Sequence, residues 1–144
     1  MLAFPRKDAS GALYTALLSS ILLRVIKSYD VNIRGKKYSP CVTKALEYIK
    51  GNLSEALTIS KISNEIFVSE STLTKHFRKE LSTSVNKYVD DLILTRCAQM
   101  ITENKMPINA ISDLFGFCDQ FYFSRKFKSK FGKTPSEYKR KWNI

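Results

Sequence analysis

The sequence has few of the residues from which catalytic and metal sites are built. It holds one histidine, His76, and three cysteines, Cys41, Cys97 and Cys118, with no Cys-x-x-Cys spacing. This pattern argues against a zinc site or a disulfide framework, and it is typical of reduced thiols buried as small apolar residues. No Gly-rich phosphate loop, HExxH or GxSxG motif occurs. We therefore expect no enzyme, no metal and no cofactor, and a structural role for His76.

The sequence also lacks an apolar run of the length that crosses a membrane. The strongly apolar segment Ala12–Ile26 is shorter than the ~20 residues needed to span a bilayer, and it contains Arg24. No Ala-x-Ala cleavage site follows it. We expect an amphipathic helix over about Gly11–Ser28 that remains part of a cytoplasmic protein, because apolar residues recur there three and four apart.

The rest of the chain contains short apolar stripes at helical spacing. A polar, basic stretch, Asp30–Pro40, is typical of a linker. Beyond it, Thr58 and Ser69 are candidate N-caps, and Pro107 is suited to the first turn of a helix. A longer helix is expected at about Ser84–Glu103. Its expected buried stripe is Val85, Tyr88, Val89, Leu92, Cys97, Met100 and Ile101. No useful length alternates with period two, so the predicted fold class is all-α.

Basic residues are concentrated at the two ends of the chain. The net charge is +11 overall, made up of +5 in residues 1–38, +1 in residues 39–106 and +5 in residues 107–144. Basic ends around a nearly neutral middle indicate a polyanionic partner, which is either nucleic acid or an anionic membrane surface. Charge alone leaves both open.

An internal repeat narrows this choice. The segments Thr58–Lys79 and Pro107–Lys128 resemble each other. At an offset of 49 the matched pairs are Ile59 with Ile108, Ile62 with Ile111, Ser63 with Ser112, and Glu70 with Asp119. One extra residue then enters the second copy, and at an offset of 50 the pairs are Leu73 with Phe123, Thr74 with Ser124, Lys75 with Arg125, Phe77 with Phe127, and Arg78 with Lys128.

Each copy predicts a helix, a short turn and a second helix. A small residue, Ser63 or Ser112, stands where the two helices cross. Apolar residues four apart face inward on the second helix of each copy. The residues left outward are Ser71, Thr74, Lys75 and Arg78 in the first copy, and Gln120, Ser124, Arg125 and Lys128 in the second. A helix-turn-helix needs this arrangement, because its second helix lies in the major groove with one face free. The competing interpretation is an ordinary helical bundle with a charged, solvated face.

The region Cys41–Tyr138 resembles the AraC/XylS-type DNA-binding domain. The most specific part is Gly116–Arg140, GFCDQFYFSRKFKSKFGKTPSEYKR. The resemblance implies a seven-helix domain in which a long helix joins two helix-turn-helix subdomains. Several positions depart from the family pattern. Ser63 and Ser112 replace a commoner alanine, Cys118 replaces a commoner serine, and Phe121 is bulkier and more apolar than usual. Ile93 stands where a basic residue is frequent, and Ser82 stands where glycine is favoured.

The resemblance also implies which residues contact DNA. The expected base-reading residues are Ser71, Thr74, Lys75, Gln120, Phe121, Ser124 and Arg125. The expected phosphate-contacting residues are Ser69, Arg78, Lys79 and Lys128. In this interpretation Arg125 pairs with guanine, Gln120 with adenine, and Phe121 touches a thymine methyl group.

These inferences define an expected organisation. Residues 1–38 are the N-terminal helix and basic linker, interpreted as a remnant of a dimerisation region. Residues 39–144 are the DNA-binding domain, with the first helix-turn-helix at about 58–80, the long linker helix at about 84–103 and the second helix-turn-helix at about 107–131.

The expected function is that of a bacterial, sequence-specific transcription regulator bound to double-stranded DNA in the nucleoid. Because members of the family it resembles are usually activators, we expect an activator that contacts RNA polymerase. Homodimerisation through residues 11–28 is a hypothesis. The alternatives are a protein-interaction module or a dominant-negative truncated regulator acting through that helix, and a peripheral membrane protein anchored by residues 1–38.

Overall fold

The computed structural model describes residues 37–142. The helix expected at 11–28, and the dimerisation region of which it would be part, lie outside the described residues. Within residues 38–143 the chain forms one compact unit. No helix between residues 37 and 142 is long and apolar enough to cross a membrane.

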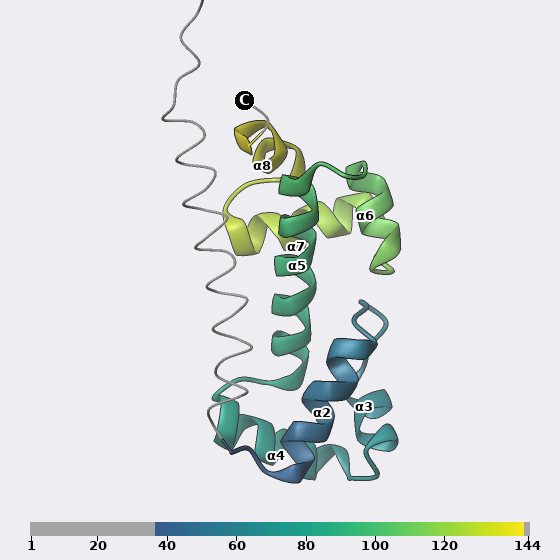
Figure 1. Ribbon diagram of the computed structural model, residues 1–144, viewed down its shortest axis with the longest axis vertical. Helices are drawn as coiled ribbons and strands as arrows, with labels where there is room; N and C mark the ends of the chain where they lie inside the picture. Colours follow the sequence, from purple (N-terminus) through teal and green to yellow (C-terminus); the bar gives the residue numbers. More distant parts are fainter. Residues whose placement is uncertain (1–36, 143–144) are drawn as a thin grey trace, which may run out of the picture. The chain divides into compact units, whose positions relative to one another are not determined.

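The described residues form seven α-helices and no strand (Figure 1). The helices are α2 (Pro40–Gly51), α3 (Ile59–Glu65), α4 (Glu70–Leu81), α5 (Val85–Glu103), α6 (Ile108–Leu114), α7 (Gln120–Phe131) and α8 (Pro135–Trp142). The predicted all-α fold is confirmed for this part of the chain.

Side-chain caps explain where several helices begin. The oxygens of Thr58 and Ser69 accept hydrogen bonds from backbone N–H groups three residues later, which confirms both predicted N-caps. Ser39 caps α2 in the same way, and Pro40 occupies the first turn of that helix. Pro40 therefore starts a helix and does not end a linker. Pro107 precedes α6 at the N-cap position, one residue before the expected first turn.

Two small cores lie at opposite ends of α5. The first, formed by α2, α3 and α4, is aliphatic apart from one ring; its fully buried residues are Val42, Ala45, Ile49, Ile62, Leu73 and Phe77. The second, formed by α6, α7 and α8, is largely aromatic. Its rings follow one another at centroid separations of 4.6–6.0 Å and belong to Phe117, Phe123, Phe127, Phe131, Tyr138 and Trp142. Each helix-turn-helix unit thus has its own apolar support.

Helix α5 is buried on more than one side. Near its start, Tyr88 meets the Phe77 ring of the first core at 5.5 Å, and the helix also contacts α6, α7 and α8. The expected single stripe was therefore partly wrong. Leu92 and Met100 are only half-buried, and the buried residues that the stripe omitted are Ile93, Leu94 and Ala98. Ile93 is fully buried, so a charged side chain at this position would lack water.

Candidate nucleic-acid interface

The two halves of the repeat have the same dimensions. A 7-residue helix is followed by a 12-residue helix in both α3–α4 and α6–α7. The turn is also repeated: the N–H of Val68 donates to the Ser63 carbonyl at 3.0 Å, and the N–H of Phe117 donates to the Ser112 carbonyl at 3.2 Å. Ser63 and Ser112 are buried at 1% and 2% exposure, as expected of small residues where helices cross.

The structure corrects the position of the extra residue in the second copy. Ser69 and Asp119 are the N-caps of α4 and α7, so these two residues are equivalent. The sequence comparison instead paired Asp119 with Glu70. Because the Val68 and Phe117 bonds are equivalent, the inserted residue is Cys118, which is exposed. Acidic side chains on Glu70 and Asp119 made the wrong pairing attractive, although one belongs to a helix and the other precedes it.

The two caps differ in charge. The Asp119 carboxylate accepts the Tyr122 N–H at 2.7 Å, and this hydrogen bond is the main cause of a lowered pKa for Asp119. The Ser69 hydroxyl accepts the Thr72 N–H at 3.2 Å. It also lies 3.0 Å from the Ser71 hydroxyl. Both caps stand at the N-terminal end of an exposed helix, where the helix dipole favours an anionic group.

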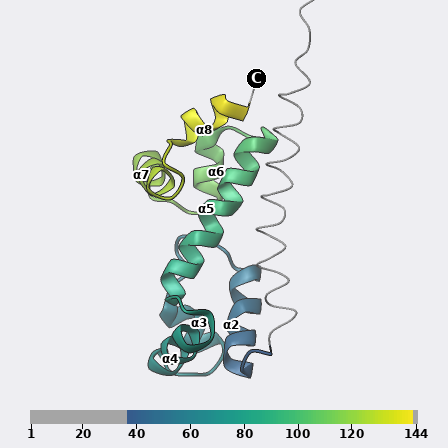
Figure 2. The same ribbon diagram turned by 90° about the vertical axis from the view of Figure 1, so that its left-hand side faces the viewer.

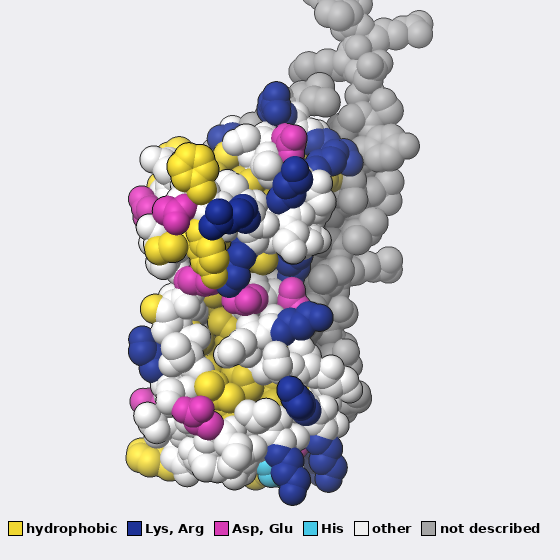
Figure 3. All heavy atoms as spheres, turned by 180° about the vertical axis from the view of Figure 1, so that it is seen from behind, with side chains coloured by type: hydrophobic (Ala, Val, Ile, Leu, Met, Phe, Trp, Pro, Cys, Tyr) yellow, Lys and Arg dark blue, Asp and Glu magenta, His cyan; other side chains and the backbone are white. Residues whose placement is uncertain are grey.

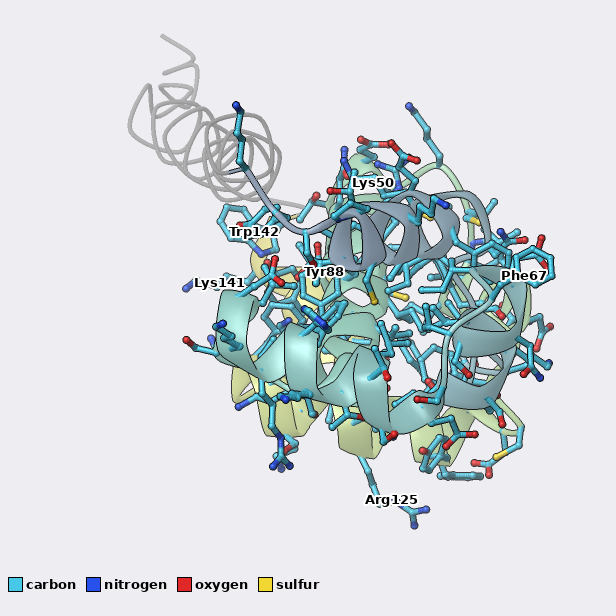
Figure 4. The ribbon with its side chains drawn as sticks, turned by 90° about the horizontal axis from the view of Figure 1, so that it is seen from below. Lys50, Phe67, Tyr88, Arg125, Lys141 and Trp142 are labelled. Carbon is cyan, nitrogen blue, oxygen red and sulfur yellow. The ribbon has the colours of Figure 1, made fainter. Side chains whose placement is uncertain are left out.

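Most expected base-reading side chains project into solvent. The exposed ones are Ser71, Lys75, Gln120, Phe121 and Arg125, whereas Thr74 and Ser124 are half-buried. Phe121 has 82% of its surface exposed, which is unusual for a large apolar side chain. Figure 4 shows Arg125 extending away from the body of the protein. The Ser71 hydroxyl is within hydrogen-bond distance of Ser69, whereas the polar side chains of Lys75, Gln120 and Arg125 make no hydrogen bond in the described range and remain available to base edges.

The expected phosphate-contacting cations lie at the far ends of the same helices. Arg78 and Lys79 are in the last turn of α4, Lys128 is in the last turn of α7, and all three are exposed. None of their side chains makes a hydrogen bond or ion pair with another residue in the described range. Ser69 is exposed too, but its hydroxyl is occupied by the cap.

Helices α4 and α7 lie on the same side of α5 (Figure 2). Both run across α5 rather than along it, as Figure 1 shows. Seen from that side, Lys and Arg side chains are spread over both halves of the surface, with acidic side chains near the middle and at a few places in each half (Figure 3). One face of residues 38–142 therefore carries both exposed helices, α4 and α7, together with basic side chains that a single partner could contact.

His76 supports the fold of the first unit. Its Nδ1 atom lies 3.1 Å from Glu80 Oε1, one helical turn later on α4. The other Glu80 oxygen accepts the N–H of Ser39 at 2.8 Å. Burial alone would raise the pKa of Glu80, but the hydrogen bonds from Ser39 and His76 outweigh it and lower the pKa. Sequence reasoning overlooked Glu80 as the partner of His76, although a spacing of four residues signals such a pair.

The cysteines are less uniform than expected. Cys97 is buried, and burial raises the pKa of its thiol to about 12, so it remains protonated. Cys41 is half-buried and Cys118 is exposed, which corrects the expectation that all three are buried. No group of three or more His, Cys, Asp or Glu residues within the described part of the chain is arranged to hold a metal ion.

Two matching helix-turn-helix units joined by one helix define a class of DNA-binding domain. A helix-turn-helix domain family matches residues 62–141. The chain belongs to the AraC/XylS family, whose members are DNA-binding transcription regulators.

Individual relatives agree with this assignment. The arabinose operon regulatory protein of Escherichia coli is 30% identical over 124 residues, which cover 85% of this chain and 42% of that protein. The multiple antibiotic resistance protein MarA of Salmonella typhimurium is 31% identical over 65% of this chain and 74% of its own length. The C-terminal domain of AraT, a response regulator from Geobacillus stearothermophilus, superposes with a TM-score of 0.71 at 28% identity, covering 76% of this chain and 91% of that domain.

Proposed function

We propose that this chain regulates transcription by inserting α4 and α7 into two successive major grooves on one face of double-stranded DNA. The observation that carries the proposal is the pair of equal, 12-residue helices on one side of α5, each with an exposed polar and basic surface. A helix of 19 residues such as α5 is about 28 Å long, close to the ~34 Å between successive grooves. One chain can then contact both grooves.

The side chains divide into base-reading residues (readers) and phosphate-contacting residues (anchors). Arg125 donates two hydrogen bonds to guanine, Gln120 pairs with adenine, and Phe121 contacts a thymine methyl group. Lys75 has the reach to contact guanine from α4, while the short Ser71, Thr74 and Ser124 allow close approach to base edges. Arg78, Lys79 and Lys128 neutralise phosphates, and Ser69 contributes through the N–H groups that follow it.

The relatives are named as operon regulators and as a response regulator, and this chain would act in the same way on bacterial nucleoid DNA. Members of this family usually activate transcription, and we include activation through contact with RNA polymerase in this proposal.

The test is selection of bound sites from a random duplex library with the full chain at near-physiological salt. We expect one enriched site with two short determinants about one helical turn apart. Binding that enriches no sequence and simply fades as salt rises would indicate general phosphate attraction. That result would contradict sequence-specific regulation and favour the protein-interaction alternative.

A further inference from the structure

The two helix-turn-helix units touch directly through Glu55, in the segment between α2 and α3. The backbone N–H of Glu55 donates to the carbonyl of Phe115, which ends α6 in the second unit, at 2.8 Å. The Glu55 side chain reaches the same unit. Its Oε1 atom accepts the Tyr122 hydroxyl at 2.9 Å and the Lys126 ammonium at 2.6 Å, both from α7. One residue therefore holds three positions of the second unit.

The contacts of Glu55 belong to a polar stripe along α7. Tyr122, Lys126 and Lys130 are spaced four residues apart, so they lie on one side of the helix. Lys126 also donates to Asp90 of α5 at 2.9 Å, and Lys130 donates to Asp91 at 2.8 Å. Tyr122 and Lys126 directly follow the expected readers Phe121 and Arg125 in sequence. A rotation of α7 that broke the stripe would also turn these readers.

This bridge crosses a cleft and not a packed core. A cavity of about 290 Å³ lies beside it, lined in part by Glu55, Val89, Asp90 and Lys126. The side chains of Glu55 and Lys126 are only 17% and 24% exposed, so water screens the pair poorly. Burial alone would lower the pKa of Lys126, but hydrogen bonds to Glu55, Asp90 and Tyr122 raise it above its ordinary value. Lys126 therefore stays charged at any physiological pH.

We propose that Glu55 is a positioning residue that sets the orientation of α7 relative to the first unit, so that both recognition helices fit DNA at one groove spacing. This inference rests on the proposed function. Two linked binding modules gain affinity only when their geometry allows both to engage together. A fixed bridge supplies that geometry before binding, which lowers the cost of association.

The first test uses the duplex enriched by the wild-type chain, the same duplex with either half scrambled, and versions with one to three base pairs inserted between the halves. We expect Glu55→Ala to bind the intact duplex roughly tenfold more weakly, with less than about a twofold change on each half, and to discriminate less against the insertions. Glu47→Ala, which removes the same charge from an exposed position on α2, should match the wild type on every duplex.

A second test needs no DNA. Spin labels at Glu65→Cys and Asp113→Cys, both exposed positions, report the separation of the units once Cys41 and Cys118 are replaced by serine. We expect Glu55→Ala to broaden the distance distribution and Glu47→Ala to leave it unchanged. Glu55→Gln keeps the shape of the side chain and should broaden it less, which provides a folded variant if alanine unfolds the protein.

The outcomes separate the two proposals. Equal losses of Glu55→Ala on intact and half sites, or an unchanged distance distribution, would overturn the positioning role. A wild-type chain that enriches no duplex would overturn the proposed function and the DNA part of this inference, while the label distances would still decide whether the bridge orients the units.

Discussion

At the scale of single residues, the two copies of the repeat differ at two left-handed backbone positions. The second copy places Gly116 and Gly132 there, with φ of 76° and 72°. The first copy places Phe67 and Ser82 at the equivalent points, with φ of 58° and 55°. A side chain in this region costs about 1–2 kcal/mol because Cβ crowds the carbonyl oxygen. Phe67 is also 93% exposed, and Figure 4 shows it projecting from the domain, so packing does not offset the cost.

We predict that Phe67→Gly and Ser82→Gly each raise the free energy of unfolding by about 0.5–1 kcal/mol. Relief of the backbone strain exceeds the added flexibility of glycine in the unfolded chain. Urea denaturation measures the change. As a control, Gly132→Ala should lower stability by about 1 kcal/mol through the backbone alone, since an added Cβ would meet no atom within 4 Å. A loss of stability in Phe67→Gly would contradict the argument.

The division between readers and anchors gives a second prediction at this scale. Arg125→Ala should cost ~1–3 kcal/mol of binding and relax the preference at one base pair, because the bidentate contact is lost. Lys128→Ala should weaken all sequences about equally and make the salt dependence shallower. Binding of both variants to the selected duplex and its single-base changes measures the difference. Unchanged base preferences in Arg125→Ala would remove this residue from the readers.

At the scale of helices, α4 is anchored at its C-terminal half to the start of α2. Glu80 bonds the N–H of Ser39, which is the N-cap of α2, and also contacts His76. The opposite side of α4 carries the expected readers. The cluster of Ser39, His76 and Glu80 thus fixes the recognition helix on the side away from its exposed face.

We predict that Glu80→Gln destabilises the protein in a pH-dependent way. The folded protein lowers the pKa of Glu80 below its usual 4.5, so the ionised carboxylate contributes stability that is fully present above that pH. That contribution is lost as pH falls through the lower, folded value. The free energy of unfolding of the wild type should exceed that of the variant by at most about 1 kcal/mol at pH 7, and this difference should close as pH falls through the lowered pKa of the folded protein. Unfolding measured from pH 7 to pH 3, with Glu47→Gln as control, tests this, and a constant difference would contradict it.

At the scale of the whole molecule, the apolar sequence stripe at 11–28 predicts self-association of the full chain. The unit at residues 38–143 has its own buried cores, so a chain lacking residues 1–30 should still fold. We expect light scattering after size exclusion to give a dimer for the full chain and a monomer for the shortened one. A monomer in both cases would contradict the dimerisation hypothesis. Pelleting with anionic vesicles that depends on residues 1–38 would support the membrane alternative.

The sequence by itself determined the local features of this protein. Caps at Thr58 and Ser69 follow from side chains that bond backbone groups three residues away, and the inward pairs of each second helix follow from helical spacing. Leu73, Phe77, Phe123 and Phe127 are all fully buried, as that spacing predicted. The two copies of the repeat could also be found from the sequence alone, because the same short-range pattern of residues occurs twice.

Only the tertiary structure decided how the copies are aligned and joined. The inserted residue is Cys118, a matter of backbone hydrogen bonds that residue similarity misjudged. Ile93 is buried because α5 contacts the helices of both cores. A single apolar stripe in the sequence indicates only one set of packing partners, so it missed this residue. Glu55 meets Tyr122 and Lys126 from 67 and 71 residues away, and no local pattern encodes a partner at that separation. Such contacts exist only once the helices have packed, which is why the orientation of the two units depended on the fold.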